Sequence, residues 1–99
     1  MDNPQQEKAI KKIVEERKKQ DKKWGEQNHH PIYWLGILTE ELGEVSKEII
    51  DHPKGDIRGE EYEEELIQLA AVAVAALECW YRHKDKKQEP IEGVYDWRQ

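Results

Sequence analysis

Residues 66–77, LIQLAAVAVAAL, constrain the fold more than any other part of the chain, because Gln68 is their only polar side chain. A helix that is apolar on nearly every side must be buried on nearly every side. Two other helices of one short chain cannot surround it. The five alanines in this segment also leave room for another helix to approach closely. The segment therefore predicts an obligate homo-oligomer, a dimer or tetramer, whose simplest form is a dimer with a four-helix-bundle core.

The overall composition agrees with a small chain that needs a partner. The 99 residues are 36% hydrophobic and 38% charged, with a net charge of -6 and a mean hydropathy of -1.07. A domain of this size buries only about two thirds of the surface that its unfolded chain exposes. We therefore expect one domain over residues 1–99, with a thin core that oligomerisation extends.

Periodicity on either side of the apolar segment predicts an all-α fold with three main helices, at about residues 4–21, 31–51 and 60–83. Pro31 suits the first turn of the second helix, where its missing N–H has no partner to lose. Pro53 ends that helix, because a proline disfavours the helical conformation in the residue before it.

The second helix carries a row of apolar residues at alternating spacings of three and four, which predicts a packed core seam. The seam consists of Leu35, Leu38, Leu42, Val45 and Ile49. Residues 84–99 show no clear period and predict an irregular C-terminal tail.

Membrane insertion and export are not indicated. No apolar run reaches the roughly 18 residues of a membrane helix, and the N-terminus lacks the apolar core of a signal peptide. Cys79 is the only cysteine, so no intramolecular disulfide can form and a buried, inert thiol is expected. Together these features favour a cytoplasmic protein with no membrane partner.

Acidic residues are concentrated in one quarter of the chain. Residues 40–65 carry three Lys or Arg against eleven Asp or Glu, a local charge of -8. Direct nucleic-acid binding needs a basic patch, so this distribution argues against it. A phosphorylated ligand would need cations to come with it.

The acids form two short motifs. Glu40, Glu41 and Glu44 read E-E-x-x-E on the second helix, and Glu65 and Gln68 read E-x-x-Q on the third. Side chains three positions apart share a helix face, and such carboxylates repel one another unless a cation such as Mg²⁺ or Mn²⁺ lies between them. A solvated acidic face is the alternative. For Gln68, contact with a neighbouring helix and contact with a metal or substrate both stay open.

These motifs resemble those of a known family. TEELGEVSKEI at residues 39–49 and EEELIQLAAVAVAALE at residues 63–78 are similar to the MazG-like all-α nucleoside triphosphate pyrophosphohydrolases, whose signature is E-E-x-x-E followed by E-x-x-D. RKKQDKKWGEQNHHPIYWLGILTEELGEV, residues 17–45, resembles the family's region leading into the second helix. The resemblance covers about residues 15–80.

The resemblance implies hydrolysis of a nucleoside triphosphate to the monophosphate and pyrophosphate, with Mg²⁺ as cofactor and Mn²⁺ as a substitute. Glu41, Glu44 and Glu65 would be metal ligands, and Gln68 stands where the family has Asp. An amide oxygen can ligate a hard cation but brings no charge. Glu40 or Glu41 would orient the attacking water as the catalytic group.

The region before the second helix supplies candidates for substrate binding. For the base and sugar these are Trp24, His29, His30 and Trp34, since an aromatic ring can stack on any base. For the phosphates they are Lys23 and, less specifically, Lys47, Lys54 and Arg82. As alternatives, the tryptophans cover helix ends and the basic side chains are solvated.

Three functions follow from these patterns. The first is a Mg²⁺-dependent pyrophosphohydrolase acting on a nucleoside triphosphate, such as a dNTP or a non-canonical NTP, in nucleotide-pool housekeeping. The second is a non-catalytic helical oligomer of the same fold that binds a nucleotide or a partner. The third is a purely structural helical oligomer with solvent-facing acids.

Overall fold

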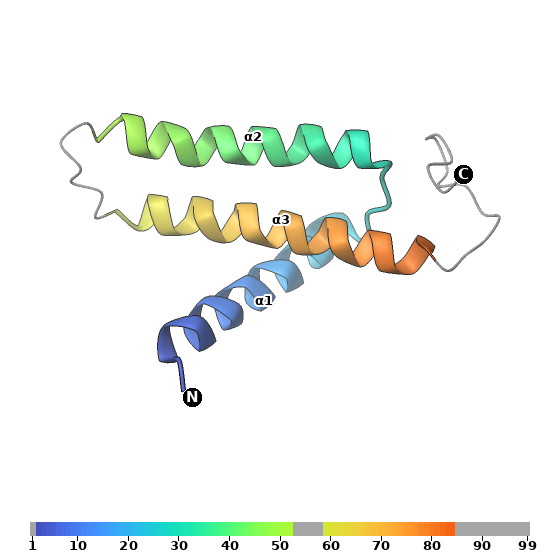
Figure 1. Ribbon diagram of the computed structural model, residues 1–99, viewed down its shortest axis with the longest axis horizontal. Helices are drawn as coiled ribbons and strands as arrows, with labels where there is room; N and C mark the ends of the chain where they lie inside the picture. The colour runs from blue at the N-terminus through green and yellow to red at the C-terminus, as the bar shows by residue number, and fades with distance from the viewer. Residues whose placement is uncertain (1, 53–58, 85–99) are drawn as a thin grey trace.

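The computed structural model describes residues 2–52 and 59–84, in which every regular element is a helix. Helix α1 spans Pro4–Trp24, α2 spans Pro31–Ile50 and α3 spans Glu60–Lys84. Helices α2 and α3 lie side by side in opposite directions, and α1 crosses α3 obliquely (Figure 1). The predicted all-α fold with three helices is confirmed. The predicted tail, residues 84–99, lies outside the described residues except for Lys84, which ends α3.

Local sequence explains where α1 begins and ends. Asn3 caps its N-terminus, because its Oδ1 accepts a hydrogen bond from the N–H of Gln6 at 3.0 Å. Gly25 stops the helix with a φ of 74°, a conformation that glycine adopts without steric cost, and its N–H donates to the carbonyl of Asp21 at 2.8 Å. Helix α1 therefore runs three residues beyond the predicted end at position 21.

The core of the single chain is small and lies along α3, which contacts both other helices. Its buried cluster consists of Trp34, Val72, Ala75 and Cys79, with Ile37, Leu38 and Ala76 packed partly buried against it. Cys79 is only 1% exposed, as expected for a buried thiol. Within the described residues, no helix is long and apolar enough to cross a membrane.

The predicted core seam of α2 is wrong in part. Val45 is buried and Leu38 is half-buried, but Leu35, Leu42 and Ile49 are 64%, 53% and 44% exposed. On a wheel of about 100° per residue, the buried Trp34 lies about 80° from Leu42. A buried tryptophan removes more apolar area from water than a leucine does. The helix is therefore turned to bury Trp34, which brings Glu41 toward α3 and leaves Leu35 and Leu42 on the outer flank.

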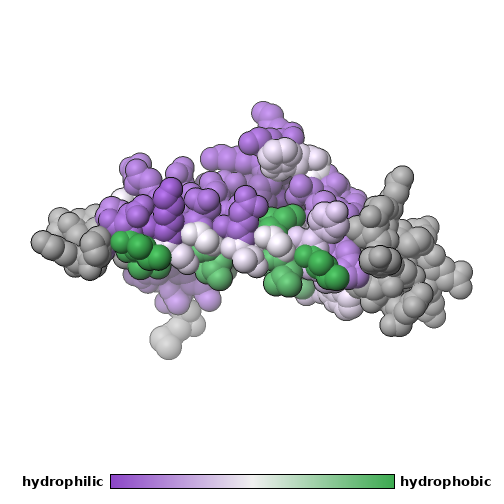
Figure 2. Space-filling model, turned by 90° about the horizontal axis from the view of Figure 1, so that it is seen from above, coloured by the Kyte–Doolittle hydropathy of each residue, from purple (hydrophilic) through white to green (hydrophobic). Residues whose placement is uncertain are grey.

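Exposed apolar residues consequently follow α2 and α3. We call them the apolar stripes; they are Leu35, Leu42 and Ile49 on α2, and Leu66, Ala73, Leu77 and Trp80 on α3. Figure 2 shows hydrophobic side chains exposed in a row along the long axis of the molecule. Within one chain, the apolar segment 66–77 is thus not buried all round.

Candidate functional site

Two glutamates on facing helices are half-buried and lack partners. Glu41 comes from α2 and Glu65 from α3, and one carboxylate oxygen of each is buried without a hydrogen bond. Burial raises the pKa of Glu41, and repulsion from Glu65, Glu40, Glu44 and Glu16 raises it further. Burial also raises the pKa of Glu65, with repulsion from Glu44 adding to it. Glu44, the third predicted metal ligand, is exposed, but it lies close enough to raise the pKa of both half-buried glutamates by repulsion.

The two residues predicted as catalytic, Glu40 and Glu41, lie on different sides of α2. Glu40 is exposed to solvent, whereas its neighbour Glu41 is half-buried on the side that faces α3. Gln68 is half-buried on α3, one turn after Glu65 and on the same side of that helix. Of the two catalytic candidates, Glu41 is the one that the fold directs toward the acid cluster.

These residues fit a hard divalent cation by their chemistry. Across residues 2–52 and 59–84, no three His, Cys, Asp or Glu side chains already stand close enough to hold an ion. The buried oxygens of Glu41 and Glu65 nevertheless have no protein donor, and carboxylate and amide oxygens are the ligands that Mg²⁺ prefers. A cation would relieve both the missing hydrogen bonds and the mutual repulsion of the carboxylates.

A cavity of about 240 Å³ opens directly beside this cluster, because Glu41 forms part of its wall. Trp24 and Trp34 line the same cavity, so the structure brings together two predicted substrate-binding residues and one predicted ligand. The remaining wall is formed by Gln20, Gln27, Ile37, Val72 and Ala75. Trp34 is 5% exposed and Trp24 is 60% exposed. Trp34 therefore belongs to the core as well as to the cavity, whereas Trp24 is free to meet a ligand.

The two glutamines of the cavity were not predicted as site residues. Gln20 lies near the end of α1 among charged residues that carry no recognisable motif. Gln27 belongs to the W-G-x-Q-x-H stretch, where the position of an amide between Trp24 and His29 was the available signal. The Oε1 atom of Gln20 accepts a hydrogen bond from Nη1 of Arg17 at 3.2 Å, which leaves its N–H groups for a ligand. The amide of Gln27 has both a donor and an acceptor, which suits the polar edge of a nucleobase.

The other predicted substrate-binding residues lie outside the cavity wall. His29 stacks on Tyr33 with ring centroids 5.9 Å apart and meets the ring of Trp34 edge-on at 4.9 Å. Burial lowers the pKa of His29, which favours its neutral form. His30 caps α2, since its Nδ1 accepts from the N–H of Ile32 at 3.0 Å. His29 therefore contacts Trp34, a residue of the cavity wall, but does not line the cavity itself.

Of the basic candidates, Lys23, Lys47 and Arg82 lie within the described residues, and none of them lines the cavity beside Glu41. Lys23 holds its ammonium 4.7 Å from the ring centroid of Trp24, a cation–π contact. Lys47 is exposed in the last turn of α2, and Lys54 lies outside the described residues. Arg82 is turned toward the linker that joins α1 to α2, where its guanidinium forms several hydrogen bonds.

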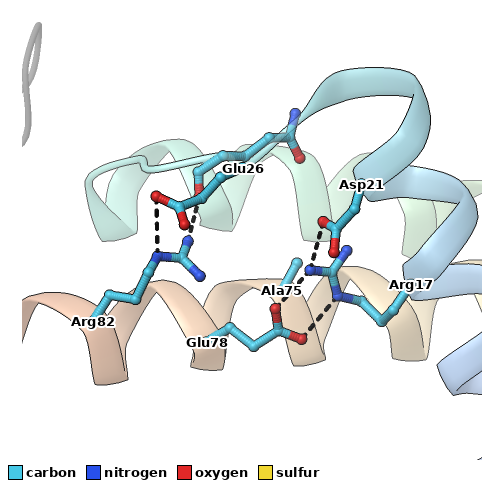
Figure 3. A pocket seen from close by; sticks show the side chains of 7 residues that line it. Arg17, Asp21, Glu26, Ala75, Glu78 and Arg82 are labelled. Carbon is cyan, nitrogen blue, oxygen red and sulfur yellow. Dashed lines mark hydrogen bonds and ion pairs between the residues drawn. The ribbon is translucent and has the colours of Figure 1, made fainter.

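A second cavity of about 330 Å³ adjoins the first, and Gln27 and Ala75 line both. Figure 3 shows its two arginines, one from α1 and one from α3, with their acidic partners. Arg17 donates to both carboxylate oxygens of Glu78, at 2.6 and 3.0 Å, and to Asp21 at 2.9 Å. This part of the site ties α1 to α3. No sequence motif distinguished Arg17 from the lysines around it.

Comparison of the chain with protein-family models, with characterised proteins and with solved structures gave no match in any of the three. The resemblance to the MazG-like family therefore stands on the motifs quoted above.

Proposed function

We propose that the chain is a Mg²⁺-dependent nucleoside triphosphate pyrophosphohydrolase of the cytoplasmic nucleotide pool, with Mn²⁺ as a possible substitute. The observation that carries this proposal is the buried pair of unpartnered carboxylate oxygens, on Glu41 and Glu65, next to a cavity with two tryptophans. The first feature suits a divalent cation and the second suits a base. Both lie within the stretch that resembles the MazG-like family.

Glu41, Glu44 and Glu65 would hold the cation, with the amide oxygen of Gln68 in the place of the family's aspartate. A bound Mg²⁺ neutralises the triphosphate and lowers the pKa of a coordinated water. Glu41, or the adjacent Glu40, would orient a water molecule for attack on the α-phosphorus and accept its proton. The bond between the α-phosphorus and the bridging oxygen then breaks, which leaves the nucleoside monophosphate and pyrophosphate.

Trp24 and the two glutamines would recognise the base. Trp24 is exposed enough to stack on a planar ring, while Gln20 and Gln27, which line the same cavity, would pair with its polar edge. The buried Trp34 forms the floor between this cavity and the core. These roles bring the base close to Glu41, which reaches the same cavity.

We also propose that a second copy of the chain covers the apolar stripes and completes a four-helix bundle. The core of one chain holds few buried side chains, and soluble monomers rarely leave apolar rows of this length exposed. A homodimer through α2 and α3 would bury both stripes and supply the neighbours that residues 66–77 require. A tetramer could be built from two such dimers.

Pyrophosphate release tests the enzymatic proposal. The protein is incubated with canonical and modified nucleoside triphosphates in the presence of Mg²⁺ or Mn²⁺, and product is measured as pyrophosphate and monophosphate. Glu41→Gln should lower metal-dependent turnover at least about a hundredfold, the size expected for loss of a general base or metal ligand, with helix content unchanged. The matched control is Glu61→Gln on the exposed start of α3, which should keep full activity. Equal turnover by Glu41→Gln and the wild type would rule out the assignment.

A non-catalytic nucleotide-binding oligomer is the second candidate, and the neutral Gln68 favours it because the site then has one fewer anionic ligand. This function predicts that a nucleotide with Mg²⁺ raises the melting temperature without any pyrophosphate release. Gln68→Asp provides the decisive comparison. If it creates turnover in a chain that otherwise only binds, the natural protein is a binder.

A further inference from the structure

The last turns of α3 form hydrogen bonds to the linker between α1 and α2, residues 25–30. The guanidinium of Arg82 donates from Nη2 to the carbonyl of Gln27 at 2.9 Å, and from Nε and Nη2 to Oδ1 of Asn28 at 3.1 and 2.9 Å. Nε2 of His83 lies 2.9 Å from the same Asn28 oxygen. Figure 3 shows Arg82 reaching from α3 to the linker. Two consecutive linker residues are therefore fixed to one side chain.

The linker residues that Arg82 holds either line the cavity beside Glu41 or lie next to residues that do. Gln27 lines it directly. The next residue but one, His29, packs edge-on against Trp34 at 4.9 Å, and Trp34 is another part of the wall. The carbonyl of His29 in turn lies 3.7 Å from the thiol of Cys79 on α3. A displacement of the linker would therefore move two sides of the cavity together.

Charge pairing alone does not explain the position of Arg82. Its nearest carboxylate, on Glu26, is 3.6 Å away and mostly exposed, and such pairs contribute little. The short contacts go instead to the carbonyl oxygen of Gln27 and the amide oxygen of Asn28, which a planar guanidinium can reach at once. A lysine would place a single ammonium there and could not span both acceptors in the same geometry.

We propose that Arg82 is a positioning residue that holds linker residues 26–29 so that Gln27 and Trp34 face the nucleotide base. The inference rests on the proposed function, since it assigns the cavity to the base. Arg82 itself does not line that cavity. It acts on the ligand through Gln27 and Asn28, and its loss should weaken nucleotide binding more than the chemical step.

The test compares Arg82→Lys and Asn28→Ala with Lys18→Arg, which exchanges one basic side chain for another at an exposed position of α1 that lines neither cavity. Each linker variant should raise the KM for the nucleotide about tenfold and change kcat less than about twofold, as expected for a lost charge-assisted hydrogen bond. Arg82→Lys combined with Asn28→Ala should raise KM by less than the product of the two single effects, because both variants lose the Arg82–Asn28 contact, while each also loses one contact of its own, to Gln27 or to His83. Lys18→Arg should leave KM near the wild-type value.

Hydrogen exchange in the nucleotide-free protein separates this inference from the proposed function. Linker amides at residues 27–30 should exchange faster in Arg82→Lys than in Lys18→Arg. A raised KM in Arg82→Lys with an unchanged KM in Asn28→Ala would mean that Arg82 meets the phosphates directly, which overturns the positioning role. If the wild type neither binds nor cleaves any nucleotide, the proposed function fails, and faster linker exchange alone would reduce Arg82 to a structural tie.

Discussion

Two neighbouring glutamates, Glu40 and Glu41, show how one residue's position changes the chemistry of the same side chain. Glu40 is exposed, and about 100° further round the helix Glu41 is half-buried with an unpartnered oxygen. Burial and repulsion favour the neutral carboxyl of Glu41 in the absence of a cation. The energetic cost of this arrangement is an expected property of a binding site, since a site prepared for a cation is unfavourable without one.

The same reasoning predicts opposite effects of one substitution on stability and on binding. Glu65→Gln removes a buried charge that faces other carboxylates, so it should stabilise the metal-free protein by about 0.5–1 kcal/mol. It should also weaken Mg²⁺ binding and abolish stabilisation by the metal. Urea unfolding with and without Mg²⁺ measures both effects, and Glu61→Gln serves as the exposed control. A destabilised metal-free variant would contradict the interpretation of the acid cluster.

At the scale of the helix, the position of α2 is governed by its largest side chain. The spacing of its leucines predicted a seam centred near Leu42, yet the buried line passes through Trp34 and Val45. Periodicity identifies an apolar side of a helix but does not say which part of a wide apolar side faces the neighbour. The rotation places Glu41 inside and leaves a second apolar flank for another molecule.

The contact between α1 and α3 should depend on pH through Glu78. A hydrogen bond from Arg17 lowers the pKa of Glu78 below its ordinary value of 4.5. The pair therefore contributes its full stability above that ordinary value, and this contribution is lost as the pH falls through the lowered pKa. Glu78→Gln should cost about 0.5 kcal/mol at neutral pH, since the pair is partly exposed, and nothing in strong acid. Urea unfolding of both proteins from pH 7 to pH 2 gives the comparison; a constant difference across this range would refute it.

At the scale of the whole molecule, the sequence predicts that other helices surround α3, and a single chain supplies only some of them. In the described part of the chain, α3 packs on α2 and α1, and this leaves Leu66, Leu77 and Trp80 exposed. Under the proposed dimer, α2 and α3 would form one half of a four-helix bundle. A second copy would double the core without any change in the chain's own fold.

This model predicts that a charge in the apolar stripes separates the subunits. Leu42→Glu should raise the dissociation constant of the oligomer at least about tenfold, because a carboxylate would have to be buried without a partner. Ile10→Glu, at an exposed apolar position on α1 outside the stripes, is the control and should leave assembly unchanged. Sedimentation over a range of concentrations measures both. A wild-type protein that stays monomeric at all concentrations would refute the proposed bundle.

Local sequence was sufficient for the helices and for the acid motifs, because caps, turns and the spacing of side chains on one helix depend on interactions within a few residues. Asn3, Gly25 and Pro31 are positioned by such rules. The joining of Trp24 and Trp34 to Glu41 in one cavity required the packing of all three helices. The contact between Arg82 and Asn28, which are 54 residues apart in the chain, required the same packing. These arrangements depend on how each helix is rotated against its neighbours, and that rotation follows from the volume of buried side chains, which a pattern of apolar and polar letters does not record.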